Sequence, residues 1–250
     1  MIQNSVTKVF TLFFLVLLIG CSKAPTAQQI VDRAIQVSGV DQLHHAAASF
    51  AFRDKNYGYQ KDGGRFEYTR TQTDSTGTVI KDVLTNDGLT RYIADTVANI
   101  TEKKRDAYAN SVNSVIYFAF LPLWLNDGAV NKTYVGEATL KGKNYHQIRV
   151  TFEEEGGGKD FEDVFYYWFD VDDYSMDYLA YKYNTDGGGM RFREAYNARQ
   201  INGVTIQDYR NLKPKTKGSV NFDQIGQAFE EGALTQLSTI DLEEIQITID

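Results

Sequence analysis

Cysteine, proline and basic residues are all scarce in this sequence. Cys21 is the only cysteine among 250 residues, so an intramolecular disulfide is excluded and stability must come from a packed core. Only three prolines occur, and acidic residues outnumber basic ones by 33 to 26, which gives a net charge of −7. Proteins that bind nucleic acid need clustered Lys and Arg to neutralise phosphates. We therefore expect no nucleic-acid partner, and no attachment to anionic lipid through charge alone.

Motifs of metal, cofactor and catalytic sites are equally absent. The sequence contains no Gly-x-Ser-x-Gly, His-Glu-x-x-His or Gly-x-Gly-x-x-Gly pattern. His44 and His45 would diverge by about 100° on a helix, and His146 lies far along the chain, so a shared zinc ion is disfavoured. The acidic residues between Asp170 and Asp177 depart from the spacing of a calcium loop and are better interpreted as a charged turn. We predict no metal site and no cofactor.

The first twenty residues have the features of a secretory signal peptide. Lys8 precedes a run, 9–20, in which one threonine is the only polar residue. A membrane-spanning helix needs about 20 apolar residues, so this run is too short for a lasting span and fits the apolar centre of a cleaved signal. It ends in Leu18-Ile19-Gly20-Cys21, which resembles the lipobox of bacterial lipoproteins. The resemblance implies that 1–20 is removed, that Cys21 carries lipid and that 21–27 is a lipidated tether.

The residues after the cysteine bear on where the anchored protein would lie. Ser22 is not the Asp that retains lipoproteins at the inner membrane of enteric bacteria, so the outer membrane is favoured. Lys23-Ala24-Pro25 lacks the acidic pair associated with surface export in Bacteroidota. We therefore expect an outer-membrane lipoprotein on the periplasmic face, with the membrane as its partner through Cys21.

The rest of the chain, 28–250, shows no linker, repeat or break in composition and is predicted to be one domain. Thr26 and Gln29 form a capping-box pattern before apolar residues at helical spacing, with Gly39 as the C-terminal cap. Further helices are predicted at 102–119 and 222–231. Alternating apolar residues and turn sequences predict antiparallel strands over 48–53, 65–73, 78–84, 89–93, 130–140, 145–153, 161–170, 176–183, 189–199, 205–212 and 237–249.

Three segments resemble a family of uncharacterised lipoproteins from Bacteroidota. They are Ser111 to Pro122, Asp177 to Tyr181 and Gly187 to Asn197. The opening of the domain, Ala27 to Arg53, is a helix followed by a strand and is similar to the lipoprotein-carrier fold of LolA and LolB. The resemblance implies that 28–250 is a single α+β domain in which a curved antiparallel β-sheet forms an incomplete barrel, with two or three helices covering the concave face. It implies no catalytic residues.

The strands predicted at 161–170 and 189–199 carry large side chains on both faces. A strand with one face in water would show polar residues on that face, so both faces are covered or one of them lines a cavity. Tyrosine and tryptophan combine an apolar body with a polar tip, as ligand-lining residues often do. The predicted ligand-binding residues are Tyr166, Trp168, Arg191, Phe192, Arg193 and Tyr196. The alternative is ordinary core packing under helices.

Three functions remain open from the sequence. The first is a membrane-anchored envelope lipoprotein, not an enzyme, that binds or carries an amphipathic or hydrophobic ligand in a half-barrel cavity. The second is a structural or accessory outer-membrane lipoprotein with a filled core that acts through protein contacts. The third is a glycan or lipid hydrolase that uses carboxylates such as Asp163 and Glu194, although no paired geometry can be read from the sequence. A measured cavity separates the first function from the second.

Overall fold

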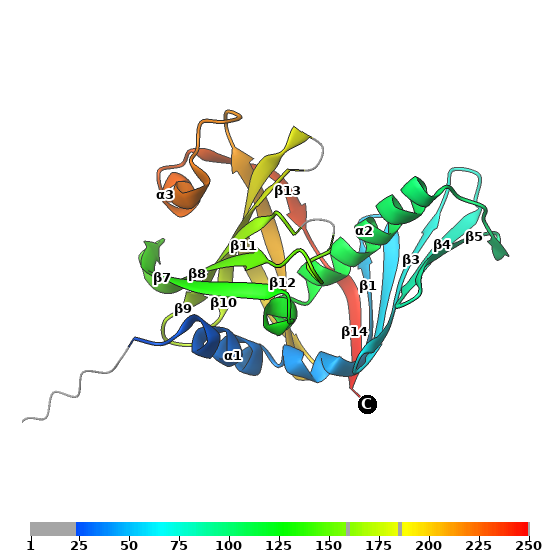
Figure 1. Ribbon diagram of the computed structural model, residues 1–250, viewed down its shortest axis with the longest axis horizontal. Helices are drawn as coiled ribbons and strands as arrows, with labels where there is room; N and C mark the ends of the chain where they lie inside the picture. Colours follow the sequence, from blue (N-terminus) through cyan, green and yellow to red (C-terminus); the bar gives the residue numbers. More distant parts are fainter. Residues whose placement is uncertain (1–23, 159–160, 185–186, 250) are drawn as a thin grey trace, which may run out of the picture.

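The computed structural model describes residues 24–158, 161–184 and 187–249 (Figure 1), so the predicted signal peptide and Cys21 lie outside the described residues. The helices are α1 (Ala27–Ser38), η1 (Val40–His44), α2 (Glu102–Ala119), η2 (Leu123–Asn126), η4 (Phe222–Gln224) and α3 (Ile225–Glu230). The strands are β1 (His45–Phe52), β2 (Lys55–Asp62), β3 (Arg65–Thr73), β4 (Val79–Thr85), β5 (Gly88–Ile93), β6 (Thr96–Val97), β7 (Val130–Leu140), β8 (Lys143–Phe152), β9 (Val164–Asp170), β10 (Met176–Tyr183), β11 (Gly189–Ile201), β12 (Val204–Pro214), β13 (Leu234–Ile240) and β14 (Glu243–Ile249). Within these residues, no helix has both the length and the apolarity needed to cross a membrane.

The strands form two seven-stranded antiparallel sheets that meet along the C-terminal segment. Sheet A has the order β14-β1-β2-β3-β4-β5-β6, and sheet B has the order β13-β12-β11-β10-β9-β8-β7. Because β13 ends at Ile240 in sheet B and β14 begins at Glu243 in sheet A, the chain passes directly from one sheet to the other. Figure 1 shows the sheets as the two walls of an open trough, crossed diagonally by α2. This is the predicted α+β incomplete barrel, and its fold class is confirmed.

The predicted caps place the two ends of α1. The backbone N–H of Gln29 donates to Thr26 Oγ1 (3.2 Å), and the Gln29 side chain accepts from the backbone N–H of Thr26 (2.9 Å). Gly39 ends the helix with φ +69°, and a Cβ there would lie 2.2 Å from the carbonyl oxygen of Gly203, so both conformation and space require glycine. The apolar side of α1 is buried in the core inside the trough, through Ile30, Val31, Ala34 and Ile35.

α2 lies inside the trough and contacts both walls. Thr101 caps its start by accepting from the backbone N–H of Lys104 (3.4 Å). Its first half packs on β3, β4 and β5 of sheet A. Its second half reaches sheet B, where the hydroxyls of Tyr117 and Tyr167 lie 3.1 Å apart. The apolar segment after α2 continues into the core, where Phe120 and Leu125 are completely buried.

Sheet B is apolar on both faces, as its sequence predicts. On β9, Phe165 and Tyr167 belong to the core inside the trough, whereas Tyr166 and Trp168 belong to a second cluster under η4 and α3. Gly226 lets α3 approach closely, because a Cβ at this position would lie 3.2 Å from the Trp168 ring. α3 therefore covers the outer face of sheet B, which Figure 1 shows at the upper left.

The structure differs from the sequence prediction in two details. β2 is missing from the predicted strands because its many polar residues hide the inward alternation of Tyr57 and Tyr59. The single strand predicted at 237–249 is two strands in different sheets, since Leu242 turns into the core and its backbone N–H donates to Asp208 (3.0 Å). The two or three helices predicted for the concave side are α1 and α2, while α3 covers the outer face.

Candidate ligand-binding cavity

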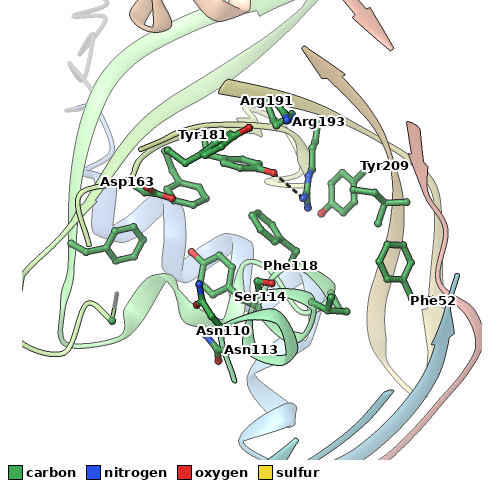
Figure 2. Close-up of a pocket in the computed structure, with 18 of the residues that line it drawn as sticks. Phe52, Asn110, Asn113, Ser114, Phe118, Asp163, Tyr181, Arg191, Arg193 and Tyr209 are labelled. Carbon is green, nitrogen blue, oxygen red and sulfur yellow. Dashed lines mark hydrogen bonds between the residues drawn. The ribbon is translucent and has the colours of Figure 1, made fainter. Parts of the chain in front are cut away.

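A cavity of about 460 Å³ lies between α2 and the inner face of sheet B (Figure 2). Its volume falls in the range of roughly 300–1,000 Å³ that is typical of small-molecule sites. Residues of α2 from Asn110 to Ala119 form one wall, and residues of β8 to β13 form the opposite wall. Much of the lining is aromatic, from Phe52, Tyr117, Phe118, Phe152, Phe165, Tyr181, Tyr183 and Tyr209. The trough is therefore not completely filled by its own side chains.

Arg193 places a buried positive charge in this cavity. The residue is 7% exposed, and its guanidinium carbon lies 3.7 Å from the centroid of the Phe118 ring. Its Nη2 donates to the hydroxyl of Tyr181 at 3.2 Å, the contact drawn in Figure 2. Its Nε and Nη1 have no hydrogen-bond partner among the described residues. Unused donors on a buried cation are costly, because water no longer solvates them.

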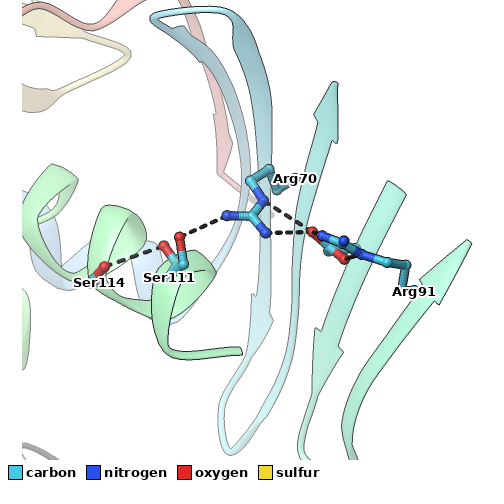
Figure 3. Close-up of polar contacts among 5 residues, drawn as sticks. Arg70, Arg91, Ser111 and Ser114 are labelled. Carbon is cyan, nitrogen blue, oxygen red and sulfur yellow. Dashed lines mark hydrogen bonds and ion pairs between the residues drawn. The ribbon is translucent and has the colours of Figure 1, made fainter. Parts of the chain in front are cut away.

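Two arginines of sheet A, in contrast, share a carboxylate. Nε and Nη2 of Arg70 donate to Asp82 at 3.0 and 2.6 Å, and the same two atoms of Arg91 donate to it at 2.7 and 2.8 Å (Figure 3). The Asp82 side chain is only 2% exposed. Nη1 of Arg70 also donates to Ser111 Oγ at 2.7 Å. This buried network therefore joins β3, β4 and β5 to α2, the helix that walls the cavity.

The hydroxyls of Tyr117 and Tyr209 in the cavity are neutral at physiological pH. Burial raises the pKa of Tyr209 to about 12, and it also raises the pKa of Tyr117 well above its usual value. Neutral hydroxyls donate and accept hydrogen bonds but carry no charge. Charge on the described lining therefore comes from Arg191, Arg193 and Asp163.

The structure brings two of the six predicted ligand residues into the cavity. Arg191 and Arg193 both extend from β11 toward it, as their spacing of two predicts. The other four lie on the opposite face of sheet B and do not line this cavity; they are Tyr166, Trp168, Phe192 and Tyr196. The alternation along the strand predicted that Arg191 and Arg193 lie on the face opposite Phe192 and Tyr196. It did not show which of the two faces borders a cavity.

The two carboxylates considered for hydrolysis also lie apart. Asp163 lines the cavity. Glu194 lies on the outer face, where it forms ion pairs with Lys141 and with Arg210, the latter at 3.4 Å. A pair of carboxylates on opposite faces of a sheet cannot act on one glycosidic bond.

The histidines and the acidic cluster have local partners. Asp170 Oδ1 accepts from the backbone N–H of Asp172 at 2.8 Å, which fits the predicted charged turn. His146 is buried and lies 3.4 Å from the hydroxyl of Tyr134. Within the described ranges, no three His, Cys, Asp or Glu side chains are grouped as metal ligands would be.

The lining residues of α2 were not predicted from the sequence. Asn113 and Ser114 are exposed at the cavity, whereas Phe118 is half-buried against Arg193. A signal was present, because two adjacent aromatic residues, Tyr117 and Phe118, follow a polar first half and cannot share one face of a helix. Such a pair indicates that the end of the helix is covered on more than one side.

Solved structures with a loose overall likeness include proteins of the kind that the opening segment resembles. A LolA superfamily protein from Nitrosomonas europaea is 11% identical, with a TM-score of 0.47 over 89% of this chain and 94% of that chain. A putative outer membrane lipoprotein-sorting protein domain from Vibrio parahaemolyticus is 6% identical, with a TM-score of 0.47 over 89% and 93% of the two chains. No curated protein matches the sequence. The predicted membership of an uncharacterised family is confirmed: residues 7–241 match the model of a family of unknown function, DUF6503, and the chain belongs to that family.

Proposed function

We propose that the protein is a membrane-anchored envelope lipoprotein that binds or carries a hydrophobic or amphipathic ligand in the cavity between α2 and sheet B. The observation that carries this proposal is the unfilled, aromatic-lined space of about 460 Å³. Unfilled apolar space lowers stability, because the lining loses the contacts that close packing would provide. A ligand that enters the cavity restores those contacts.

The lining combines apolar and polar side chains, which suits an amphipathic molecule. Phe165 of β9 is buried against the strands beside it. Asn113 and Ser114, on the other wall, are exposed to solvent. An apolar chain would therefore lie among the aromatic rings, and the amides and hydroxyls of α2 would face the water at the entrance.

The position of the carboxylates supports binding without chemistry. Asp163 and Glu194 lie on opposite faces of sheet B, so the described part of the cavity lining lacks the carboxylate pair that the hydrolase hypothesis requires. The proposal accordingly assigns the protein no enzymatic step.

The anchoring part of the proposal depends on Cys21. We propose that 1–20 is removed, that Cys21 is acylated, and that 21–27 tethers the domain to the periplasmic face of the outer membrane. A Cys21→Ser variant should lose incorporation of labelled palmitate and move from the membrane to the soluble fraction. Membrane retention of this variant in the absence of detergent would contradict acylation as the anchor.

The ligand-binding part can be tested with the protein that begins at residue 22. All strands and helices of the described fold lie between Ala27 and Ile249, so this shorter chain contains the complete core. We expect saturable binding of N-phenyl-1-naphthylamine, a neutral apolar dye that becomes fluorescent in apolar surroundings. Mass spectrometry of protein purified from native envelopes should also detect a co-purifying lipid.

A variant that fills the cavity separates specific binding from surface adsorption. Ser114→Trp places a large ring at the entrance from an exposed helix position, so the fold should be retained while dye binding is lost. Lys104→Trp adds the same ring to the same helix at an exposed position away from the cavity and is the matched control. If both variants bind the dye as well as the wild type does, the cavity is not the binding site and the proposal fails.

A further inference from the structure

The unused donors of Arg193 indicate what kind of ligand the cavity accepts. Arg193 is more than nine-tenths buried and lines the cavity, yet its Nε and Nη1 have no partner among the described residues. Buried polar groups are nearly always hydrogen-bonded, so these two free donors point to an acceptor that belongs at this place.

Three other arginines with largely buried side chains have a carboxylate partner within the fold. Arg70 and Arg91 share Asp82, and Arg199 lies 3.1 Å from Asp208. Arg193 instead contacts aromatic rings, with Phe118 at 3.7 Å, Tyr181 at 5.3 Å and Tyr209 at 6.0 Å from its guanidinium carbon. Ring faces stabilise a cation only partly. They do not accept the hydrogen bonds that Nε and Nη1 can donate in the plane of the guanidinium.

The charges around the cavity favour an anion despite the acidic chain. The protein has a net charge of −7, but the described lining of the cavity contains two arginines, Arg191 and Arg193, and one carboxylate, Asp163. In Figure 2, Asp163 lies on the far side of Tyr181 from Arg193. The hydroxyl of Tyr181 accepts from Arg193, so its own proton can be donated to a further acceptor. Arg193 and Tyr181 thus form a donor set for the oxygen atoms of an anion.

We propose that the ligand is an amphiphile with an oxyanion head group, a carboxylate or a phosphate, bound by Arg193 and Tyr181, with its apolar chain among the aromatic side chains of the cavity. This inference rests on the proposed function and adds the charge of the ligand to it. Guanidinium groups bind carboxylate and phosphate through charge-assisted hydrogen bonds, which are stronger inside a protein than in water. The head group would supply a counter-charge that Arg193 does not receive from the described residues.

The test compares probes that differ in their head group alone. Dodecyl phosphate, dodecanoate, dodecanol and dodecyltrimethylammonium, each below its micellar concentration, are used to displace the bound dye from the protein that begins at residue 22. Inorganic phosphate and acetate are added in parallel, because they carry the anion without a chain. We expect the two anionic amphiphiles to bind at least about tenfold more tightly than dodecanol.

Arg193→Met should remove this preference, so that the anionic probes bind this variant no more tightly than dodecanol does. The loss expected for the anionic probes is about 10- to 100-fold, as for a hydrogen bond to a charged group. Arg210→Met is the matched control, because Arg210 neighbours the same strand but lies on the outer face, 3.4 Å from Glu194. Melting curves of both variants report whether the fold is intact, and Arg193→Lys should restore part of the preference.

The outcomes separate this inference from the proposed function. If dodecanol binds the wild type as tightly as dodecyl phosphate, or if Arg193→Met keeps the preference, the oxyanion is refuted while ligand binding stands. If inorganic phosphate binds as tightly as dodecyl phosphate, the site holds a free anion and the chain-bearing ligand is refuted. If the dye and all four amphiphiles fail to bind in the cavity, the proposed function itself fails.

Discussion

The buried network around Asp82 offers a direct test of how the cavity wall is held. Its carboxylate accepts four hydrogen bonds from Arg70 and Arg91, and Arg70 in turn donates to Ser111 on α2. An Asp82→Asn variant keeps the shape of the side chain but removes its charge. Two guanidinium groups whose side chains are only 7% and 10% exposed would then have no counter-charge.

The expected magnitude follows from the burial of the three charges. Removing one partner of a buried ion pair costs about 3–5 kcal/mol, since the remaining charge is left without solvent or partner. Domains are stable by about 5–15 kcal/mol, so this loss is a large share of the total. For a domain of this size, each kcal/mol lowers the melting temperature by about 2–4 °C. We expect Asp82→Asn to melt at least about 6 °C below the wild type.

Urea unfolding followed by circular dichroism measures this change in free energy. Asp62→Asn is the control, because Asp62 pairs with His45 at the surface and its side chain is 80% exposed. A triple variant in which Asp82, Arg70 and Arg91 all become apolar should recover stability, since it leaves no unpaired charge. A loss below about 1 kcal/mol in Asp82→Asn would show that water reaches the network, and the reasoning would be refuted.

Three further predictions concern pH, the outer face and the first helix. Burial by itself would raise the pKa of Asp82, but hydrogen bonds from Arg91 and Arg70 outweigh this effect and lower that pKa. The resulting stabilisation is present above the unfolded pKa of about 3.9 and is lost as the pH falls through the folded pKa. Acid titration should therefore destabilise the wild type more steeply than Asp82→Asn below about pH 4. Trp168→Phe should lower the free energy of unfolding by about 0.5–3 kcal/mol without altering dye affinity, because Trp168 lies under α3, away from the cavity; weaker dye binding would place the ligand on the wrong face. Thr26→Ala should cost about 1 kcal/mol in urea unfolding, whereas Thr26→Ser, which retains the capping oxygen, should not.

Local signals in the sequence predicted the helices well. The capping box at Thr26 and the glycine at 39 are short-range features whose geometry depends on a few neighbouring residues, and α1 begins and ends where they indicate. The predicted helix at 102–119 is likewise observed as α2. The run 130–140 is observed as a strand, because its alternation reports burial on one side of a pleated surface. The run 176–183 is also a strand, although its middle is buried on both faces.

Partners that are distant in the sequence account for most of what could not be predicted. β2 becomes a strand because β1 and β3 pair with it on both sides, and at Gly58 a Cβ would lie 2.5 Å from Thr69 Oγ1 on β3. Whether the strand at 237–249 continued or changed sheet depended on Asp208, which binds the backbone N–H of Leu242. Neither contact can be inferred from the local sequence pattern.

The local sequence pattern is sufficient to show which segments form helices and which form strands. Its alternation also places Arg191 and Arg193 on one face of a strand and Phe192 on the other. Only the folded protein shows which of those faces borders a cavity: α3 packs on Trp168 at the outer face, whereas α2 contacts the inner face through Tyr117 and Phe118 and leaves a cavity beside them. Alternation depends on the backbone period of a single strand, whereas empty space depends on how far apart two packed elements are held. For that reason the sequence placed the two arginines on one face, and the cavity that they line was found only in the structure.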